Sequence, residues 1–405
     1  MLSAIAWRKE HDNSMKGMSK DLFIIAAGFI AAMHIGKLPP AIPVLQQQLG
    51  ISFIQSGLLL SLVQGAGMCF ALLIGSYIQK IGFKLCILLG LSLLTIASAW
   101  GSFAQSFDAL LLLRVIEGFG FLLVTLTGPA FIRQLVPLQH ISAKMGLWSA
   151  YMGGGMGIAL LVAPFLIAQY GWSVVWLSFA MITAALLLCI AMFIPQPNVA
   201  LNTTPVIGLI RDTLKHPAAW LLALIFGTYA GQWFALVGFL PMIYAQNQIS
   251  AELAGALTAS VAVANAVGTW GCGLLLQRGF QAKTLVQLGF AVLIICSLGF
   301  YLSKDALPFL LQYLTVFSFS LFGGLVAATV FAQALHFAPY PAAISTTVGM
   351  ILQCSAISQF VLPPVIATVV SQTGAWFWAG ILMSALSFVG IMLSRRLFQM
   401  QHGSN

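Results

Sequence analysis

The feature that most constrains this chain is a series of long apolar segments that contain almost no charged residues. Of its 405 residues, 60% are hydrophobic and only 6% are charged, whereas soluble domains carry roughly 25% charged residues. The segments exceed the ~18 residues expected of a membrane-spanning helix, and they lack the alternating pattern of an outer-membrane barrel. The sequence therefore predicts an all-α integral membrane protein.

Charged or turn-rich breaks divide the apolar sequence into twelve predicted spans. They are expected near residues 21–47, 53–78, 85–104, 109–132, 145–169, 173–194, 218–245, 253–276, 285–302, 306–333, 343–370 and 375–394. The longest connection is polar and separates six spans from six. We therefore expect a tail at 1–20, an N-terminal half at 21–194, a central loop at 195–217, a C-terminal half at 218–395 and a tail at 396–405.

The distribution of lysine and arginine predicts the topology, because cytoplasmic loops are enriched in both residues. With the N-terminus inside, the inner segments hold 14 of the 17 basic residues: Arg8, Lys9, Lys16, Lys20, Lys80, Lys84, Arg133, Lys144, Arg211, Lys215, Arg278, Lys283, Arg395 and Arg396. We expect both termini in the cytoplasm and, since the loops are short, a bacterial inner membrane. The net charge of +9 is scattered over separate loops, so it does not indicate nucleic-acid binding.

Several residues recur at a spacing of 198 positions, which indicates a duplication. The pairs are Pro43 and Pro241, Gln48 and Gln246, Ile51–Ser52 and Ile249–Ser250, Gly75 and Gly273, and Gln79 and Gln277, with Lys80 matched by Arg278. Two parallel halves of six helices, with a site between them near the middle of the membrane, are a known plan of transporters.

A glycine- and lysine-bearing loop follows the second predicted span and reads GSYIQKIGFK at 75–84. It resembles the loop of the major facilitator superfamily, G-x-L-x-D-R-x-G-R-R/K. Gly75, Lys80, Gly82 and Lys84 fit the pattern, whereas Gln79 replaces its acid. The resemblance covers the whole chain and implies twelve transmembrane helices in two pseudo-symmetric six-helix halves. It also implies an inner gate built from this loop and from its counterpart, which contains Gln277 and Arg278.

Two further segments carry the resemblance. Arg114, Gly118 and Gly120 fit the family's fourth-helix motif, R-x-x-x-G-x-G. The antiporter signature of the fifth helix is incomplete around Ala163–Pro164, which argues against a drug/proton antiporter. The segment MGLWSAYMGGGMG at 145–157 is similar to the cyanate and nitroimidazole permease branch, which implies a small, anionic or weakly polar substrate. Its glycines are expected to allow close helix approach rather than nucleotide binding.

Three charged residues fall inside predicted spans: Lys37 in the first, and Arg114 and Glu117 in the fourth. A charge in the membrane interior is costly unless it faces water, a partner or a ligand. The resemblance places the first and fourth helices along a central cavity. Surplus positive charge there suits an anionic substrate, because arginine offers a planar fork and lysine a point charge.

Glu117 is the only carboxylate expected inside a span, and we interpret it as a candidate proton-coupling residue. Burial favours a protonated carboxyl group, whereas a neighbouring cation favours the carboxylate. Arg114 lies three residues away on the same helix face. An arriving anion would compete for Arg114 and free Glu117 to take a proton. The alternative is a structural Arg114–Glu117 pair that orients the helix.

The surroundings of Lys37 leave two interpretations open. Pro39, Pro40 and Pro43 break or bend its helix just beyond it. Lys37 therefore contacts substrate or a gate, or it extends its long side chain to the membrane surface or has a structural role. His34, one turn earlier, is either a second proton-coupling residue or a packing residue.

The remaining candidate substrate-binding residues are uncharged. They are Tyr151, Gln232, Trp233, Asn265, Gln312 and Gln353. Buried amides need partners, so these side chains alternatively bond only between helices. Trp172 and Trp176 are expected to anchor the chain at the bilayer interface.

Together these features predict a secondary active transporter that works by alternating access and takes up a small anion with protons. The alternative is a proton-coupled exporter of an amphipathic drug or metabolite. A non-transporting sensor would call for additional soluble domains. Neither a Walker motif nor a catalytic triad is recognisable, and the six cysteines fall in or beside apolar spans, so we expect no enzyme activity, metal or cofactor.

Overall fold

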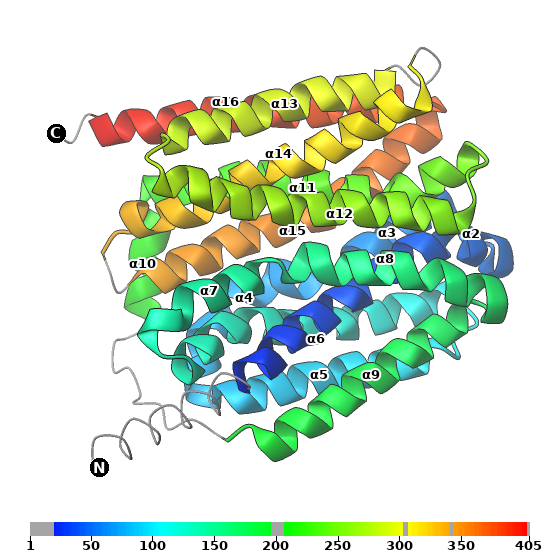
Figure 1. Ribbon diagram of the computed structural model, residues 1–405, viewed down its shortest axis with the longest axis horizontal. Helices are drawn as coiled ribbons and strands as arrows, with labels where there is room; N and C mark the ends of the chain where they lie inside the picture. Colours follow the sequence, from blue (N-terminus) through cyan, green and yellow to red (C-terminus); the bar gives the residue numbers. More distant parts are fainter. Residues whose placement is uncertain (1–19, 196–205, 303–306, 341–342, 403–405) are drawn as a thin grey trace, which may run out of the picture.

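The computed structural model describes residues 20–195, 206–302, 307–340 and 343–402, and within these ranges a few side chains, including those of Gln79 and Lys80, lie outside the described part. Figure 1 shows a bundle of long helices that run side by side. The first helix covers residues 20–36. The helices that follow it are α2 (Leu38–Leu49), α3 (Phe53–Leu62), α4 (Gly65–Ile81), α5 (Phe83–Gly101), α6 (Phe107–Leu135), α7 (Leu138–Ser149), α8 (Tyr151–Tyr170), α9 (Trp172–Phe193), α10 (Val206–Lys215), α11 (Pro217–Gln246), α12 (Ala251–Gln277), α13 (Ala282–Leu302), α14 (Phe309–Phe337), α15 (Ile344–Thr373) and α16 (Phe377–His402).

The twelve predicted spans are confirmed, because 12 helical segments of the described chain are long and apolar enough to cross a membrane. Three of the predicted spans differ in detail from single helices. The first comprises residues 20–36 and α2, the second comprises α3 and α4, and the predicted span at 145–169 is shared between α7 and α8. Residues 1–19 and 403–405 of the predicted tails and residues 196–205 of the predicted central loop lie outside the described residues, whereas residues 396–402 continue α16.

The break in the first span falls at Lys37, where the sequence predicts a disturbance. Pro39 and Pro40 lack a backbone N–H and therefore cannot continue the hydrogen-bond ladder of the preceding turn. Lys37 itself still donates its backbone N–H to the carbonyl of Met33, at 3.0 Å. The break at Val63–Gln64 in the second span contains no proline, and the sequence did not predict it.

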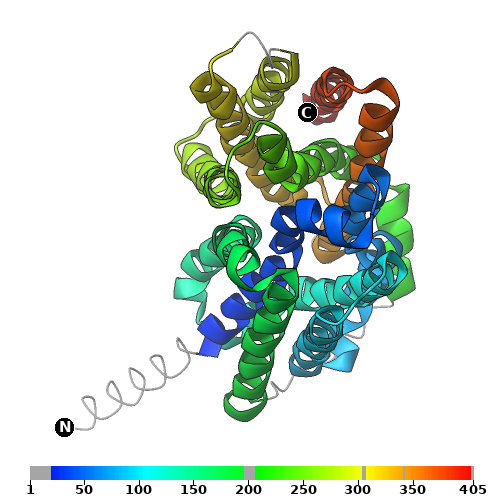
Figure 2. The ribbon, with the colours of Figure 1, turned by 90° about the vertical axis from the view of Figure 1, so that its right-hand side faces the viewer.

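The helices form two groups, which are separated in the view along the bundle in Figure 2. The first group contains residues 20–36 and α2 to α9, and the second contains α11 to α16. The groups meet where α8 packs against α12, where α3 and α4 pack against α15, and where α2 packs against α11. This arrangement confirms the predicted fold class of two six-helix halves.

Equivalent hydrogen bonds in the two halves support the predicted duplication. Trp172 donates its indole N–H to Oε1 of Gln48, at 2.9 Å. Trp376 donates its indole N–H to Oε1 of Gln246, at 3.1 Å. Each bond ties the last helix of a half to the end of its first span. Both halves therefore retain the same local packing at the positions where the sequence repeats.

The glycine run of α8 allows two close approaches, as the sequence predicts. A Cβ atom at Gly155 would overlap the backbone oxygen of Phe29 in the first helix. A Cβ atom at Gly153 would overlap the backbone oxygen of Ala262 in α12. The run therefore brings α8 against its own half on one side and against the C-terminal half on the other.

Candidate functional site

A cluster of charged side chains lies buried in the interior of the N-terminal half. Glu117 on α6 is 1% exposed and receives an ion pair at each carboxylate oxygen. Lys37 Nζ lies 2.5 Å from Oε1, and Arg114 Nη1 lies 2.6 Å from Oε2. The first and fourth spans thus bring the three intramembrane charges into one group. Counting Lys37 and Arg114 as cations and Glu117 as an anion, the cluster carries a formal charge of +1.

The ammonium group of Lys37 has a hydrogen-bond acceptor for each of its three protons. It donates to Glu117, to Oγ of Ser98 on α5 at 2.7 Å and to Nδ1 of His34 at 3.2 Å. The Nζ atom also lies 4.7 Å from the ring centroid of Trp176 on α9, a distance at which a cation is attracted to the ring. Lys37 therefore points into the half and does not extend to the membrane surface.

The hydrogen bonds around His34 assign its tautomer. Thr183 on α9 donates its hydroxyl proton to the carbonyl of Phe179, at 2.6 Å. The hydroxyl oxygen, which lies 2.8 Å from Nε2 of His34, therefore acts as an acceptor there. Nε2 carries the proton and Nδ1 accepts from Lys37. This neutral form leaves the cluster's charge at +1 and makes His34 a bridge between Lys37 and α9.

Arg114 uses only part of its guanidinium group. Its Nε donates to the carbonyl of Leu59 on α3, at 3.3 Å. Its Nη1 donates to the carbonyl of His34, at 2.9 Å, and to Glu117. Its Nη2 is buried and has no hydrogen-bond partner among the described residues. A buried donor without a partner is costly, so this nitrogen marks a place where an acceptor from outside the chain would be stabilised.

The position of this donor is close to the contact between the halves. Leu59, which binds Arg114, is followed by Leu60, whose side chain packs against Gly238 of α11 in the C-terminal half. Arg114 is itself 1% exposed. A solute could therefore reach Nη2 only after the helices around it move apart.

The polar candidates of the C-terminal half form a separate, uncharged cluster. Trp233 on α11 donates to Oγ of Ser320 on α14, at 2.8 Å. Asn265 on α12 donates to the hydroxyl of Tyr229, at 2.5 Å, and to the carbonyl of Ser320, at 2.8 Å. These bonds join three spans within one half. The structure thus brings together two of the candidate substrate-binding residues, Asn265 and Trp233. Their hydrogen-bond partners belong to the same half.

Gln232 occupies the position that repeats His34, and it is bound in a comparable way. Its Nε2 donates to the carbonyl of Thr228, at 2.6 Å, and its Oε1 accepts from Ser387 on α16, at 3.0 Å. His34 similarly reaches Thr183 on α9, the last helix of its own half. The pair therefore extends the duplication to buried polar side chains.

The other predicted contacts lie away from the charged cluster. Gln312 on α14 donates to the carbonyl of Leu307, at 2.8 Å, near the end of its span. Tyr151 packs against Trp148, with ring centroids 5.0 Å apart and the rings tilted. Gln353 on α15 bonds to the backbone of α4 in the other half. The structure does not bring these three side chains together with Arg114.

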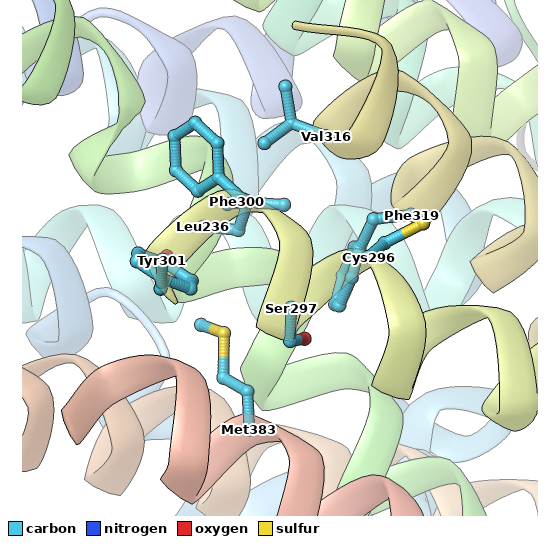
Figure 3. A pocket seen from close by; sticks show the side chains of 8 residues that line it. All are labelled: Leu236, Cys296, Ser297, Phe300, Tyr301, Val316, Phe319 and Met383. Atoms are coloured by element: carbon cyan, nitrogen blue, oxygen red, sulfur yellow. The ribbon is translucent and has the colours of Figure 1, made fainter. Parts of the chain in front are cut away.

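A narrow pocket inside the C-terminal half, which has no room for a water molecule, is distinct from both clusters (Figure 3). Its lining is Leu236, Cys296, Ser297, Phe300, Tyr301, Val316, Phe319 and Met383. The lining is mostly apolar, and the hydroxyl of Ser297 has no partner among the described residues. The pocket offers no charged group to an anion.

The fold agrees with a comparison against known families. The family model of the Major Facilitator Superfamily matches residues 24–363. The chain belongs to the Major Facilitator Superfamily.

Curated relatives within this superfamily include transporters with different named substrates. The chain is 25% identical over 299 residues to the cyanate transport protein CynX of Escherichia coli (strain K12), and the match covers 71% of this chain and 74% of CynX. It is 28% identical over 141 residues to the quinolone resistance protein NorA of Staphylococcus aureus, which covers 34% of this chain and 36% of NorA. This superfamily member is therefore a transporter of small molecules. The match to CynX agrees with the resemblance seen in the sequence.

A solved structure confirms the superfamily fold. The chain is similar to a bacterial homologue of the human lysosomal transporter Spinster in an inward-facing and unoccupied conformation, with a TM-score of 0.71 and 15% identity. The match covers 94% of this chain and 93% of the homologue. At this identity the likeness concerns the fold alone.

The residues predicted to gate this superfamily member lie on two connections. Gly82 joins α4 to α5 with a φ of 99°, a conformation that favours glycine. Lys84 donates to the carbonyl of Ala191, at 2.8 Å, and so contacts its own half. Gln277 and Arg278 are exposed at the end of α12, and Gly75 is exposed on α4. The side chains of Gln79 and Lys80 lie outside the described residues.

Several residues of the clusters were not candidates in the sequence. Ser98 accepts a hydrogen bond from Lys37, and Thr183 accepts one from His34. Tyr229 and Ser320 accept the hydrogen bonds of Asn265. Trp172 and Trp176 were expected to anchor the chain at the bilayer interface, but they are 5% and 1% exposed and pack inside the N-terminal half. Among the described residues, no three His, Cys, Asp or Glu side chains form a group that could hold a metal ion.

Proposed function

We propose that this transporter takes up a small anionic solute together with protons by alternating access of its two halves. The observation that carries the proposal is the buried Nη2 of Arg114, which has no hydrogen-bond partner among the described residues. An arginine N–H in a low-dielectric site binds an anion more strongly than it would in water. A carboxylate or a similar small oxyanion offers the acceptor that this nitrogen needs.

The charge of the cluster supports coupling to protons. The empty cluster has a formal charge of +1, from Lys37, Arg114 and Glu117. Binding one anion alone would reduce it to zero, and binding one proton with the anion would return it to +1. Charges in the membrane interior are costly. If the anion and the proton bind together, the protein changes between its outward- and inward-open states with the same buried charge whether it is loaded or empty.

The contacts of Glu117 suggest how the two events are linked. If the anion draws Arg114 toward itself, the Nη1–Oε2 bond of 2.6 Å is weakened. Oε2 is then available for a proton, while Oε1 keeps its bond to Lys37. In this account Lys37 and His34 hold Glu117 in place, and Arg114 is the residue that contacts the anion. Contact of the anion with Asn265 or Trp233 of the opposite half would require their bonds to Tyr229 and Ser320 to open.

The topology belongs to the same proposal. The described cations Lys84, Arg133, Arg211, Arg278 and Arg395 belong to the segments predicted to be inner, which supports a cytoplasmic location for this end of the bundle. We accordingly propose an inner-membrane protein with cytoplasmic termini, halves at 21–194 and 218–395, and a cytoplasmic central loop.

Equilibrium binding to purified protein tests the role of Arg114. The probes are radiolabelled cyanate, acetate and nitrate, and the variants are Arg114→Lys and, as a matched control on an exposed site of the same helix, Arg133→Lys. Lysine keeps the charge but lacks the planar fork, and a hydrogen bond to a charged group contributes about 1.5–3 kcal/mol. We expect at least one probe to bind the wild type and the control equally, and to bind Arg114→Lys about tenfold or more weakly. Equal binding to all three proteins would contradict the proposal.

The match to NorA supports a second candidate, proton-coupled export of an amphipathic drug. That match covers about a third of each chain, and the cluster's surplus positive charge is unfavourable for a cationic drug. Everted membrane vesicles distinguish the two candidates. Proton-driven accumulation of a quinolone, with no uptake of any of the three anions into right-side-out vesicles, would favour export.

A further inference from the structure

Helix α10 carries an exposed stripe that the transport cycle does not explain. Ile207, Arg211, Leu214 and Lys215 are exposed and follow one another at intervals of four, three and one residues, a spacing that places them on one side of a helix. Ile207 is 79% exposed and Leu214 is 41% exposed. On the opposite side, Thr213 is 1% exposed and the helix packs against α11 and α15. The free face thus combines two large apolar side chains with two cations.

The stripe continues onto the outer surface of the bundle. The chain turns at His216, whose backbone is extended, so α10 does not prolong the axis of α11. Trp220, in the first turns of α11, is 42% exposed and donates its indole N–H to the carbonyl of Leu214, at 2.8 Å. Leu224, one turn further along α11, is 43% exposed. The apolar residues of α10 therefore join a row on a spanning helix, where exposed apolar side chains face lipid.

The packing of α10 holds it at this end of the bundle. Asp212 accepts a hydrogen bond from the hydroxyl of Tyr340, on the connection between α14 and α15, at 3.0 Å. Figure 1 shows α10 at the same end as the last turns of α16 (red). A tryptophan next to lysine and arginine at the end of a spanning helix is typical of the boundary between acyl chains and headgroups.

The charges near the stripe favour an anionic partner. Arg211 Nε lies 3.6 Å from Oδ1 of Asp212, and both side chains are exposed, so water weakens this pair. Lys215 lies three residues after Asp212 but forms no ion pair with any described acid. The other described acid at this end, Asp21, is buried and paired with Lys144 at 2.8 Å. The surface is accordingly positive, and basic residues beside a membrane attract anionic lipids by about 1 kcal/mol each.

We propose that the stripe Ile207–Arg211–Leu214–Lys215 binds the surface of the bilayer and selects lipids with anionic headgroups. Ile207 and Leu214 enter the boundary region together with Trp220, and Arg211 and Lys215 bind headgroup phosphates. An amphipathic helix with this composition lies in the plane of the interface. Because α10 contacts α11 and α15, lipid bound there stabilises the junction between the central connection and the C-terminal half.

Thermal unfolding in nanodiscs tests this interaction surface. The purified protein is placed in discs of phosphatidylcholine alone or of phosphatidylcholine with 30% phosphatidylglycerol. The variants are Arg211→Gln/Lys215→Gln and, as a control with the same loss of charge at the same end, Arg395→Gln/Arg396→Gln. We expect phosphatidylglycerol to raise the Tm of the wild type and of the control by several degrees. We expect no increase for the α10 variant.

The remaining outcomes decide against the proposal. An equal increase for all three proteins would show that α10 does not bind the anionic lipid. An equal loss in both variants would show that only the total charge of this end matters. If water-soluble glycerophosphoglycerol raises the Tm of detergent-solubilised wild type as much, the site binds a free phosphate rather than a membrane. Ile207→Ser/Leu214→Ser, which keeps the charge, should also reduce the increase, and an unchanged increase would exclude insertion of the stripe.

Discussion

Lys37 Nζ lies 2.5 Å from Glu117 Oε1 inside the N-terminal half, and the two side chains are 0% and 1% exposed. One residue comes from the break in the first span and the other from the middle of α6. The pair is therefore the point at which the first span is fixed to the fourth. All three protons of the Lys37 ammonium group are bound to side chains of the same half.

Replacing Lys37 by methionine should strongly destabilise the protein. The change leaves Ser98 without its donor and Glu117 with Arg114 as its remaining cation. Removing one partner of a buried ion pair costs about 3–5 kcal/mol. The measurement is unfolding in detergent, followed by tryptophan fluorescence. Lys283→Met, at an exposed position, is the control and should leave the unfolding midpoint unchanged; equal midpoints for both variants would mean that the pair contributes nothing.

Replacing Thr183 by valine should weaken the bridge between Lys37 and α9. His34 then loses the acceptor for its Nε2 proton, and a buried donor without a partner costs about 1–3 kcal/mol. We expect lower stability and slower uptake. The control is Thr125→Val on α6, because the hydroxyl of Thr125 bonds only to carbonyls of its own helix. If the control loses as much uptake as Thr183→Val, the bond to His34 is not the cause.

Gln353 should act as a latch between the halves. Its Oε1 accepts from the N–H of Leu72, at 3.1 Å, and its Nε2 donates to the carbonyl of Met68, at 3.0 Å. An α-helix pairs these same two groups with each other, so one amide from α15 binds a hydrogen-bonding turn of α4. Each bond contributes about 0.5–1.5 kcal/mol.

Replacing Gln353 by leucine should therefore favour states in which α4 and α15 separate. Distances between spin labels on the two helices would show a larger population of long separations. Gln232→Leu is the matched control, because its amide bonds lie within the C-terminal half. An unchanged distribution for Gln353→Leu, or an equal shift for Gln232→Leu, would contradict the latch.

Replacing Gly155 by valine should disrupt the approach of α8 to the first helix. The new side chain would overlap the backbone oxygen of Phe29, and overpacking typically costs about 1–3 kcal/mol. A Cβ at Gly271 on α12 meets nothing within 4 Å, which makes Gly271→Val the control. We expect a lower Tm for Gly155→Val only. A similar decrease in both would point to helix propensity rather than to contact.

The sequence predicted the spans, the halves and the charged residues for simple physical reasons. Membrane helices must be apolar over about 20 residues, and a charge inside one is rare enough to be noticed. The repeat of Gln48 as Gln246 indicated the duplication, and the structure adds the two tryptophan bonds that these residues make. The spans and the charged residues can be recognised from one segment of the sequence at a time, and the halves from the comparison of two segments.

The contacts that depend on helix packing could not be predicted from the sequence. Serine and threonine commonly bond to their own helix, so nothing distinguished Ser98 and Thr183 from other hydroxyls. Gln353 was a candidate for substrate binding, with bonding between helices as its alternative; here it bonds to the backbone of α4, a partner that the sequence did not single out. The helix break at Val63–Gln64 contains no proline, so the sequence did not indicate it. In each case the deciding neighbour lies far away in the chain.

Proton-driven uptake by the Glu117→Gln variant tests the account most directly. Wild type and variant are reconstituted in liposomes, and accumulation of a bound anion is measured with and without an inward proton gradient. We predict that the wild type concentrates the anion only with the gradient, and that Glu117→Gln retains exchange of internal for external anion but no gradient-driven accumulation. If Glu117→Gln concentrates the anion as the wild type does, Glu117 is a structural partner of Lys37 and Arg114 and the coupling proton binds elsewhere.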